Sequence, residues 1–511
     1  MRERSSVEIA GKARRSRVGL AAAILSLMFI TAACSGSGSE SEPAGTDEAG
    51  AAEAGTTAKP YELVMAYPSF GDVSDAASVQ EAISALTLEK MNATVKLVPI
   101  SVANYQDQMN LMLAGSEKLD VVYTSVWRGF ASQVSRGQIV PLDDLIAQYG
   151  QGIGQYVPEE IAEAGKVKGE TYGIPSVKAW ALTPSFVMRK DLVDKHGIEV
   201  SQLKTWADIG PVLEIIKTKE PGVTPIVNYN IGEAIGSGML FLDPLGMGSG
   251  VLDFDGTGYQ ILDGTESEDY NDMLKLVREW FLAGYMSKDV ATVQESGGTL
   301  LKAGSAFSFI RNINDCYTES VSAGVELVCV GLDPTYMTRN SVSSNMISIA
   351  RNSGNPEAAM QFINLLYTDA EIINLFTNGI EGKHYVKGEN GLIRKPDGTT
   401  STGYDSNQFA VGNNFLSAVW EGNAPDIWEQ MKKLNESAVK SRALGFSFDM
   451  EPVKAEMAAV SNVQNQFNAG FLTGTTDPSE LPSFIEKLKA AGRDAVIAEK
   501  QKQLDAWLAT Q

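Results

Sequence analysis

Between residues 61 and 125, short apolar runs alternate with helical patterns, and this alternation constrains the fold more than any other feature. The runs YELVMAY, ATVKLVPI and LDVVYTS are rich in β-branched and aromatic residues, as strands buried on both faces are. Between them, apolar residues recur at helical spacing over 79–91 and again over 105–115. The order strand, helix, strand, helix, strand predicts a mostly parallel sheet with right-handed crossovers.

A second set of alternating patterns begins near residue 180. The segments WALTPSFVMRKDLVDKHG, TWADIGPVLEIIKTKEPGVTPIV and NDMLKLVREWFLAG combine strand-like and helical periodicity. About 450 residues follow the N-terminal segment, which is more than one hydrophobic core usually serves. We therefore expect two α/β lobes.

Helix signals are strong toward the C-terminus. Asn355 can cap one helix, Thr368 and Glu371 form a capping-box pattern for the next, and Gly379 is placed to end it. The last residues predict two amphipathic helices broken at Gly492. Their expected buried stripe is Ile497, Leu504, Trp507 and Leu508.

The N-terminus has the layout of an export signal. Three arginines between residues 14 and 17 precede sixteen uncharged residues, 18–33, which end in small residues directly before Cys34. Residues 35–59 are rich in Ser, Gly, Ala and acid, so they predict a disordered, solvated tether. We expect a signal peptide over 1–33, a lipid anchor on Cys34 and a tether over 34–59. An ordinary signal peptide whose cleavage site lies near a cysteine is the alternative.

Charge excludes several partners. The formal net charge is −21, and without residues 1–33 it is −25, from 36 basic and 61 acidic residues. Such a chain repels nucleic acid and anionic lipid surfaces. No apolar run after residue 33 approaches membrane-spanning length, so the body is expected to be soluble.

Cysteine and histidine usage predicts no metal site. His196 and His384 are the only histidines, and no Cys-x-x-Cys occurs. The fragment Asp253-x-Asp255 suggests a calcium loop, but Gly264 stands where the bidentate glutamate belongs, so we interpret the fragment as a β-turn. The two remaining cysteines either form a disulfide or are buried free thiols: Cys316 and Cys329.

Several segments resemble a known family. The run MNLMLAGSEKLDVVYTSVW, then QIVPLDDLIAQYG and GIPSVKAWALTPSFVMRKDLV, resembles the first half of a family 1 extracellular solute-binding protein, the substrate receptor of an ABC importer. The tail, NPEAAMQFINLLYTDAEIINLFTNGIEGKHYV through GFSFDMEPVKAEMAAVSNV to AVIAEKQKQLDAWL, resembles the uncharacterised C-terminal domain of the LplA-like lipoprotein branch. Together these segments cover nearly all of residues 60–511.

The resemblance implies a two-lobed α/β clamshell of the type II periplasmic-binding-protein class, with two or three crossovers and the ligand held between the lobes. Lobe one is expected over 60–178 plus about 333–378, and lobe two with the helical C-terminal region over 179–332 plus about 379–511. It also implies a monomer without enzymatic activity or cofactor. Such a receptor carries a sugar or oligosaccharide to permease subunits at the extracytoplasmic face of the cell membrane.

Ligands of doubly wound lobes bind beyond the carboxyl ends of the strands. The loops YPSFGD and TSVWRGF follow the first and third strands. They present six candidate residues: Tyr67, Phe70, Asp72, Ser125, Trp127 and Arg128. A pyranose needs flat aromatic platforms together with hydrogen-bonding groups, which Trp127 and Arg128 supply. A core role for Trp127 is the alternative.

Other candidates lie at the expected crossover and in later loops. Tyr172 and Trp180 flank the crossover, where hinge packing is the alternative role. Arg311 and Asn312 follow the strand-like run SAFSFI and can bind hydroxyls or a carboxylate, although Arg311 could equally form a surface ion pair. The remaining candidates are Glu381, His384 and Tyr385 in GIEGKHYV, as hinge or pocket wall, and Trp420 as a stacking platform.

Three functions are compatible with these features. A receptor closes on its ligand without changing it. A secreted glycoside hydrolase would need two carboxylates across a cleft, for which Glu381 and Asp72 are conceivable. A sensory or structural lipoprotein without a transporter would share this sequence.

Overall fold

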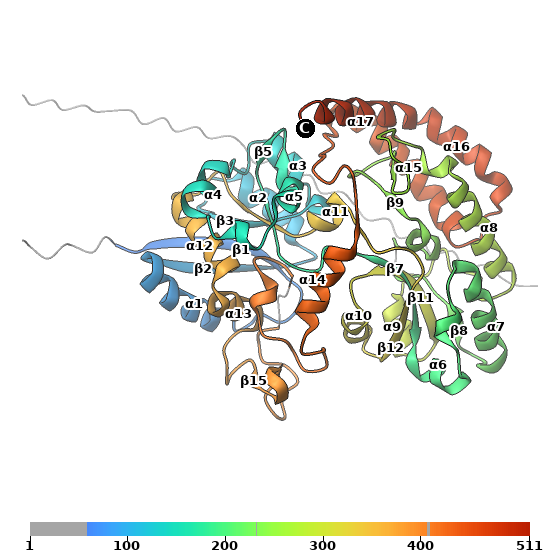
Figure 1. Ribbon diagram of the computed structural model, residues 1–511, viewed down its shortest axis with the longest axis horizontal. Coiled ribbons are helices and arrows are strands. Elements are labelled where there is room, and N and C mark those ends of the chain that lie inside the picture. The colour runs from blue at the N-terminus through green and yellow to red at the C-terminus, as the bar shows by residue number, and fades with distance from the viewer. Residues whose placement is uncertain (1–58, 231, 406–408) are drawn as a thin grey trace, which may run out of the picture. The chain divides into compact units, whose positions relative to one another are not determined.

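The computed structural model describes residues 59–511, apart from residue 231 and residues 406–408. The expected export signal, the lipidated Cys34 and the tether up to residue 58 lie outside the described residues. In Figure 1 the first of two sheets lies on the left and the second on the right, with helix α14 (Ile427–Ser437) between them.

The strands and helices expected between residues 61 and 125 build the first sheet. They are β1 (Tyr61–Ser69), α1 (Ala76–Met91), β2 (Ala93–Ser101), α2 (Tyr105–Ala114) and β3 (Val121–Thr124). β1 pairs in parallel with both β2 and β3. Two later strands, β14 (Met346–Ile349) and β6 (Ile174–Pro175), complete the order β2-β1-β3-β14-β6, in which β14 is antiparallel to both neighbours.

The second sheet has the order β12-β7-β11-β8. Its strands are β7 (Thr183–Arg189), β8 (Thr224–Ile226), β11 (Ala306–Ile313) and β12 (Leu327–Gly331). β7 runs against β11 and β12, whereas β11 and β8 are parallel, so this sheet mixes both pairings. The associated helices are α6 (Lys190–His196), α7 (Ile209–Lys219), α8 (Glu268–Leu282), α9 (Gly297–Lys302) and α10 (Cys316–Ala323).

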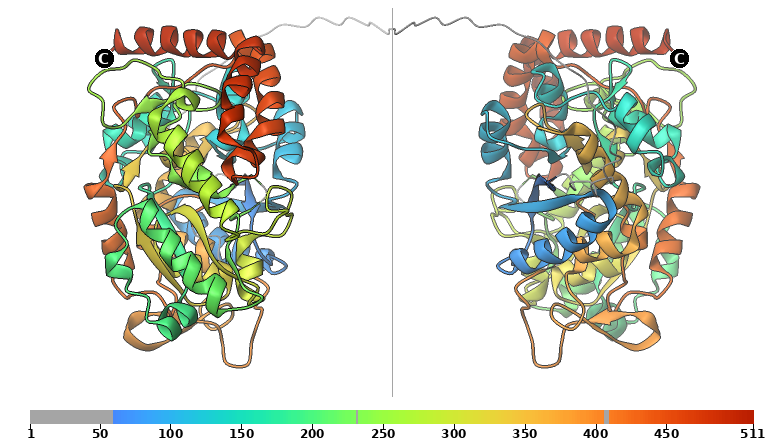
Figure 2. Two further views of the ribbon diagram at one scale, coloured as in Figure 1. Left: turned by 90° about the vertical axis from the view of Figure 1, so that its right-hand side faces the viewer. Right: turned by 90° about the vertical axis from the view of Figure 1, so that its left-hand side faces the viewer.

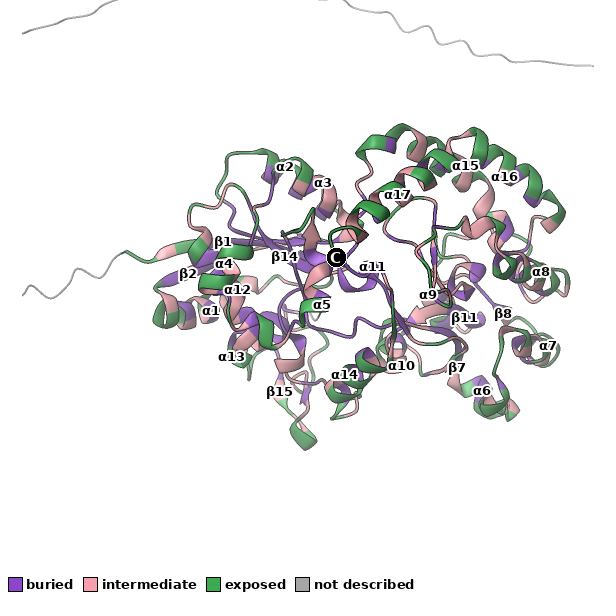
Figure 3. Cartoon of the chain, turned by 45° about the horizontal axis from the view of Figure 1, so that its top comes forward, coloured by how far each residue is buried: buried purple, intermediate pink, exposed green. Residues whose placement is uncertain are grey.

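Shorter elements connect these layers. They include α3 (Phe130–Ser135), α4 (Asp143–Tyr149), α5 (Glu159–Ala162), β4 (Lys166–Val167), β5 (Glu170–Thr171), β9 (Leu242–Asp243), β10 (Leu252–Asp253), β15 (Val386–Lys387) and β16 (Ile393–Arg394). Figure 3 shows that the strands are mostly buried while the covering helices expose one face, as amphipathic helices over a sheet do.

Each sheet has its own hydrophobic core. The first core joins residues of β1–β3 and β14 to α12 (Pro356–Thr368) and α13 (Ala370–Asn378). Tyr404, Ala410 and Val411 also belong to it, so the expected assignment of everything after residue 379 to lobe two is wrong for this segment. The physical reason is that long-range hydrogen bonds hold this segment there: the Tyr404 hydroxyl donates to the Phe376 carbonyl of α13, and the Ala410 carbonyl accepts from the Ser176 hydroxyl.

The helix boundaries at α12 and α13 follow local signals, with one correction. The Asn355 side chain accepts from the Ala358 N–H at 3.0 Å and caps α12, and Gly379 ends α13. The expected capping box of Thr368 and Glu371 is wrong. Asp369 caps α13 instead, because its carboxylate reaches two backbone N–H groups, whereas the Thr368 hydroxyl donates to the Asn364 carbonyl.

The C-terminal helices pack on the second sheet's side. These are α15 (Lys454–Leu472), α16 (Leu481–Ala490) and α17 (Arg493–Leu508), which Figures 1 and 2 show together above that sheet. Phe471 and Phe484 join the second core, and Leu504 joins a smaller cluster with Phe446. Gly492 breaks the helix pair with a φ of 98°. None of the described helices is both long and apolar enough to span a bilayer.

Three chain segments cross between the two sheets, and they lie side by side. Leu182 in the first crossover bridges to Tyr336 in the second. The second crossover contains β13 (Tyr336–Met337) and α11 (Arg339–Val342), and β13 pairs with β17 (Val439–Lys440) of the third. Asn435 on α14 accepts from the N–H groups of Trp180 and Ala181, which fixes the first crossover against that helix.

Candidate functional site

Two large aromatic side chains stand exposed at neighbouring strand ends of the first sheet. Phe70 directly follows β1 and is 59% exposed, and Trp127 follows β3 and is 57% exposed. Because β1 and β3 are adjacent and parallel, their carboxyl ends lie together at one edge of the sheet. Exposed rings at this position are available to a ligand rather than to the core.

Hydrogen bonds to buried groups hold the turn that carries Trp127. Ser125 is almost fully buried, and its hydroxyl accepts from the Trp127 N–H at 3.2 Å. The Val126 N–H donates to the Ser343 carbonyl beside the second crossover. The half-buried Arg128 follows in the same turn. Ser125 therefore positions the turn, while Trp127 and Arg128 remain accessible.

The loop that carries Phe70 is fixed by a later segment of the chain. The Asp72 N–H donates to the Asp405 carboxylate at 2.8 Å, and the Asp72 carboxylate accepts from Ser74 and Ser401. These hydrogen bonds hold the pKa of Asp72 below its usual value. Gly71 is required here, because a Cβ would stand 2.6 Å from the Asp405 carboxylate.

A second contact holds the same loop through His384. The His384 ring is fully buried, its Nδ1 accepts from the Ile380 N–H at 2.9 Å, and its Nε2 lies 2.8 Å from the Asp75 carboxylate. Since Nδ1 accepts, Nε2 carries the proton and donates to Asp75. Hydrogen bonds from Lys383, Ser78 and His384 lower the pKa of Asp75. His384 thus supports the loop between β1 and α1 instead of lining a pocket.

In the second sheet, a charged side chain and an aromatic ring lie together near the carboxyl end of β11. Arg311 on β11 lies over the Tyr229 ring at 3.9 Å, and its Nη1 is 2.5 Å from the Glu319 carboxylate. Burial raises the pKa of Glu319. The buried Asn312 Oδ1 receives no hydrogen bond from any described group. Arg311 and Asn312 therefore place polar groups near the carboxyl end of β11, beside an aromatic face.

An aromatic cavity of about 330 Å³ joins the two sides. Tyr317 on α10 donates to the Glu421 carbonyl at 2.9 Å, which ties the second lobe to the segment after Trp420. Trp420 is half-buried, and its Nε1 donates to Asn378. The main lining residues are Tyr317, Val321, Tyr404, Asp405, Phe409, Trp420 and Trp428.

Two aromatic residues expected at the ligand are buried elsewhere. Tyr67 is fully buried and packs edge-on against Phe376 at 4.9 Å, because its side chain points from β1 toward α13. Trp180 is only 5% exposed, its Nε1 donates to the Ser176 carbonyl, and it lines a different cavity of about 440 Å³. The sequence predicts Tyr67 in a strand-end loop and Trp180 as a lining of the cleft; in the structure Tyr67 lies within β1 and Trp180 is almost fully buried.

The other candidates serve local structure. The Tyr172 hydroxyl donates to Glu170 in the β4–β5 hairpin, and Tyr385 is largely buried with its hydroxyl accepting from Asn374. Glu381 pairs with Lys387 at 3.1 Å. Glu381 and Asp72 are thus each engaged with separate neighbours.

Cys316 and Cys329 form a disulfide with a Cα–Cα distance of 5.7 Å. It joins the first residue of α10, the helix that also carries Tyr317 and Glu319, to strand β12.

In the expected β-turn, the Asp253 carboxylate accepts from the Asp255 N–H at 2.7 Å. Within residues 59–511, leaving out 231 and 406–408, no group of three His, Cys, Asp or Glu side chains is placed to hold a metal ion.

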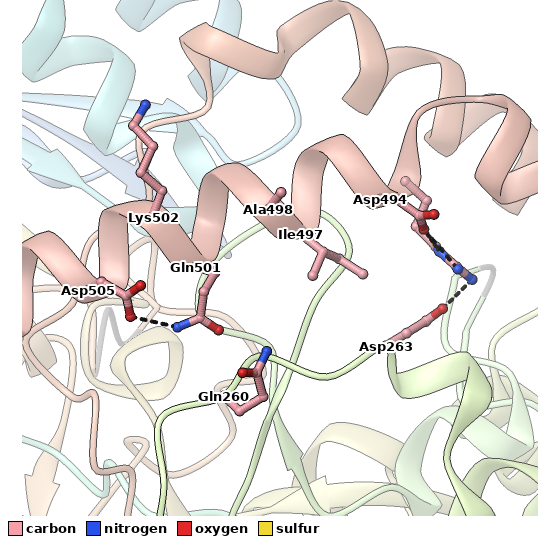
Figure 4. Close-up of a pocket in the computed structure, with 9 residues that line it drawn as sticks. Gln260, Asp263, Asp494, Ile497, Ala498, Gln501, Lys502 and Asp505 are labelled. Atoms are coloured by element: carbon pink, nitrogen blue, oxygen red, sulfur yellow. Dashed lines mark hydrogen bonds and ion pairs between the residues drawn. The ribbon is translucent and has the colours of Figure 1, made fainter.

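A further hollow of about 480 Å³ runs along α17. Gln501 donates to Asp505, as Figure 4 shows, and Arg493 pairs with Asp263. Because these groups satisfy each other, the hollow has few groups left for a ligand. The strand-end loops and the aromatic cavity are the better candidate site.

Comparison with known protein families identifies the family to which this chain belongs. The model of the bacterial extracellular solute-binding protein family matches residues 71–372, which is more than half of the chain. The chain belongs to this family. A domain of unknown function, DUF3502, matches residues 442–509, the region of α15–α17. The solute-binding protein therefore carries that domain against its second lobe.

Individual relatives agree with the family. A carbohydrate ABC transporter substrate-binding protein of Streptococcus pneumoniae is 27% identical over 436 residues, covering 82% of this chain and 86% of that protein. The crystal structure of the N-glycan transport solute-binding protein NgtS from the same organism superposes with a TM-score of 0.79 at 24% identity, covering 88% of this chain and 99% of that chain. NgtS in complex with Man5GlcNAc gives a TM-score of 0.68 at the same identity and coverage. These structures show the two-lobed clamshell fold that the sequence predicts.

Proposed function

We propose that this protein is the extracytoplasmic receptor of an ABC importer for a neutral oligosaccharide, which it binds between its lobes and releases unchanged to a permease. The exposed pair Phe70 and Trp127 at the ends of β1 and β3 carries the proposal, because aromatic platforms at a strand-end edge are what a sugar face needs. The names of relatives support the ligand class: one is a carbohydrate substrate-binding protein, and NgtS has been crystallised with Man1GlcNAc and Man5GlcNAc.

Both lobes contribute residues that contact the ligand. Trp127 and Phe70 stack on the apolar faces of sugar rings, and Arg128 and Asp72 bind hydroxyls beside them. Arg311 and Asn312 approach the same ligand from β11, and Trp420 extends the contact along the aromatic cavity. The Arg311 charge is already paired with Glu319, which favours hydroxyls over a carboxylate as its ligand.

Lobe closure couples binding to transport. Three adjacent crossovers can bend together, and contacts from both lobes at once favour the closed state. The protein acts as a monomer that presents its closed form to the permease.

The direct test is a thermal-shift screen with mannose- and N-acetylglucosamine-containing oligosaccharides, followed by mass spectrometry of the recovered ligand. A ligand that binds the native state raises the melting temperature by mass action. We expect at least one glycan to raise it and to return chemically intact. Steady product formation would move the protein to the glycoside hydrolases.

The anchor is proposed from Cys34. Replacing Cys34 with Ser removes the thiol that carries the lipid, so we expect release into the medium or an uncleaved precursor, measured by fractionation and mass spectrometry. A trimmed Cys34→Ser protein that stays in the membrane fraction would contradict the anchor and leave the receptor function standing.

A further inference from the structure

The cavity that contains Trp180 is built by all three crossovers. Val177 and Trp180 come from the first crossover, Met337 from the second and Lys440 from the third. It has a volume of about 440 Å³, within the range of roughly 300–1,000 Å³ that is usual for small-molecule sites. We call this cavity the hinge pocket.

The base of the hinge pocket is apolar, and its inner polar groups are already used. Ile161, Phe415 and Leu416 add to the apolar lining. The buried amide of Asn435 accepts from Trp180 and Ala181 and donates to the Lys178 carbonyl. These hydrogen bonds fix the floor of the pocket, and the Asn435 amide already has hydrogen-bond partners without a ligand.

The rim, in contrast, carries unengaged polar groups. Within the described part of the chain, the side chains of Gln155, Tyr156 and Glu436 have no hydrogen-bond or ion-pair partner, and all three line the pocket. The two rim lysines are occupied, since Lys440 lies 2.5 Å from Glu160 and Lys432 lies 2.6 Å from Glu429. An apolar floor with a few free polar groups above it is the usual design of a small-molecule site.

We propose that the hinge pocket is a second binding site, which takes a single neutral sugar ring. The flat apolar faces of such a ring suit Trp180 and Phe415, and its hydroxyls suit the amide of Gln155, the phenol of Tyr156 and the carboxylate of Glu436. The unpaired Glu436 and the net charge of −21 oppose an anionic ligand. The site stands apart from the strand-end loops, because Phe70, Trp127 and Arg311 are not among its lining residues.

Binding in the hinge pocket changes the affinity of the cleft. Lobe closure must bend the crossovers that form the pocket wall, so a ring held there stabilises one arrangement of the crossovers over the other. The coupling is reciprocal: an oligosaccharide in the cleft changes the affinity of the pocket by the same factor.

Fluorine NMR of protein labelled with 5-fluorotryptophan detects binding in the hinge pocket, because Trp180 lines that pocket. The Trp180 signal is assigned with Trp180→Phe. The probes are D-mannose and N-acetyl-D-glucosamine, titrated into a Phe70→Ala/Trp127→Ala variant that lacks the cleft platforms. We expect one of the sugars to shift the Trp180 signal saturably in this variant.

Pocket variants decide whether that shift comes from the hinge pocket. Gln155→Ala removes one rim hydrogen bond and should weaken binding about 2–10-fold. Leu416→Phe fills the pocket and should abolish the shift. Gln151→Ala, the same change outside the lining, should leave it unaltered. Absence of a saturable Trp180 shift with both sugars, or a shift that Gln155→Ala and Leu416→Phe leave intact, would overturn the proposal without affecting glycan binding in the cleft.

Discussion

At the scale of single residues, exposure separates the groups that can touch a ligand from those that hold them in place. Phe70 and Trp127 are exposed, whereas Ser125 and His384 are buried. Ser125 caps the Trp127 turn, and His384 donates to Asp75 in the loop that carries Phe70. Replacements of the two kinds of residue should therefore have different effects on affinity and stability.

Trp127→Ala should weaken oligosaccharide binding by about 1–3 kcal/mol, since an aromatic platform is lost. Its stability should fall much less than the roughly 3–5 kcal/mol of an emptied core tryptophan site, because the ring is 57% exposed. Calorimetric titration and thermal melting measure the two effects. Leu282→Ala, at a side chain 68% exposed on α8, is the matched control and should change neither. A large loss of stability with intact affinity would place Trp127 in the core.

His384→Ala should lower the free energy of unfolding by about 1–3 kcal/mol, because the partly buried Ile380 N–H loses its acceptor. It should also weaken ligand binding, since Asp75 and the Phe70 loop lose a support. His196→Ala is the control: that ring is also buried and pairs with Glu220, but it lies at the end of α6. Urea unfolding and titration should show both losses for His384 and only the loss of stability for His196. Equal affinities in the two variants would contradict the positioning role.

At the scale of elements, α10 links the disulfide to the candidate site. Cys316 begins the helix, Tyr317 reaches the Glu421 carbonyl across to the other lobe, and Glu319 holds Arg311. The disulfide to β12 keeps this helix against the second sheet. Loss of the disulfide should therefore lower the stability of the protein and loosen the contact of Glu319 with Arg311 on β11.

The double variant Cys316→Ala/Cys329→Ala should be less stable by about 2–4 kcal/mol, because the disulfide that closes this short loop constrains the unfolded chain. Denaturant unfolding of the variant against the oxidised protein measures the change. Adding a thiol reductant should destabilise the parent protein and leave the variant unchanged. If reductant destabilises both equally, the disulfide does not contribute in this way.

At the scale of the whole molecule, three crossovers are the only described chain connections between the two sheets, and they are paired with one another. A hinge made of adjacent strands permits rotation of one lobe against the other while each core stays intact. The separate cores around the two sheets are consistent with such rigid-body motion.

Small-angle scattering should therefore show a smaller radius of gyration when the oligosaccharide is added. The expected cause is closure, in which Arg311 and Trp127 contact the ligand together. Trp127→Ala should require more ligand for the same decrease, whereas Leu282→Ala should behave as the parent protein. A radius that stays constant at saturating ligand would rule out closure as the transport signal.

The sequence alone determined the features that depend on neighbours along the chain. Periodic apolar residues placed the first three strands and their helices, Asn355 capped α12, and Gly379 and Gly492 ended or broke helices. The two exposed aromatic candidates were also predictable, because a residue just after a strand lies at the sheet edge wherever the strand itself goes. One local prediction was wrong: Asp369, and not Thr368, caps the N-terminus of α13.

Only the tertiary structure decided what distant segments cover. The backbone N–H of Trp180 is held by Asn435, more than 250 residues away, and His384 is buried against Asp75 across 309 residues. Tyr67 and Phe70 are three residues apart, yet one packs on α13 and the other is exposed. The insertion of β14 between β3 and β6, and the return of residues 404–411 to the first core, likewise depend on long-range packing. Periodicity reports which face of an element is apolar, but the partner that buries that face is set by the whole fold.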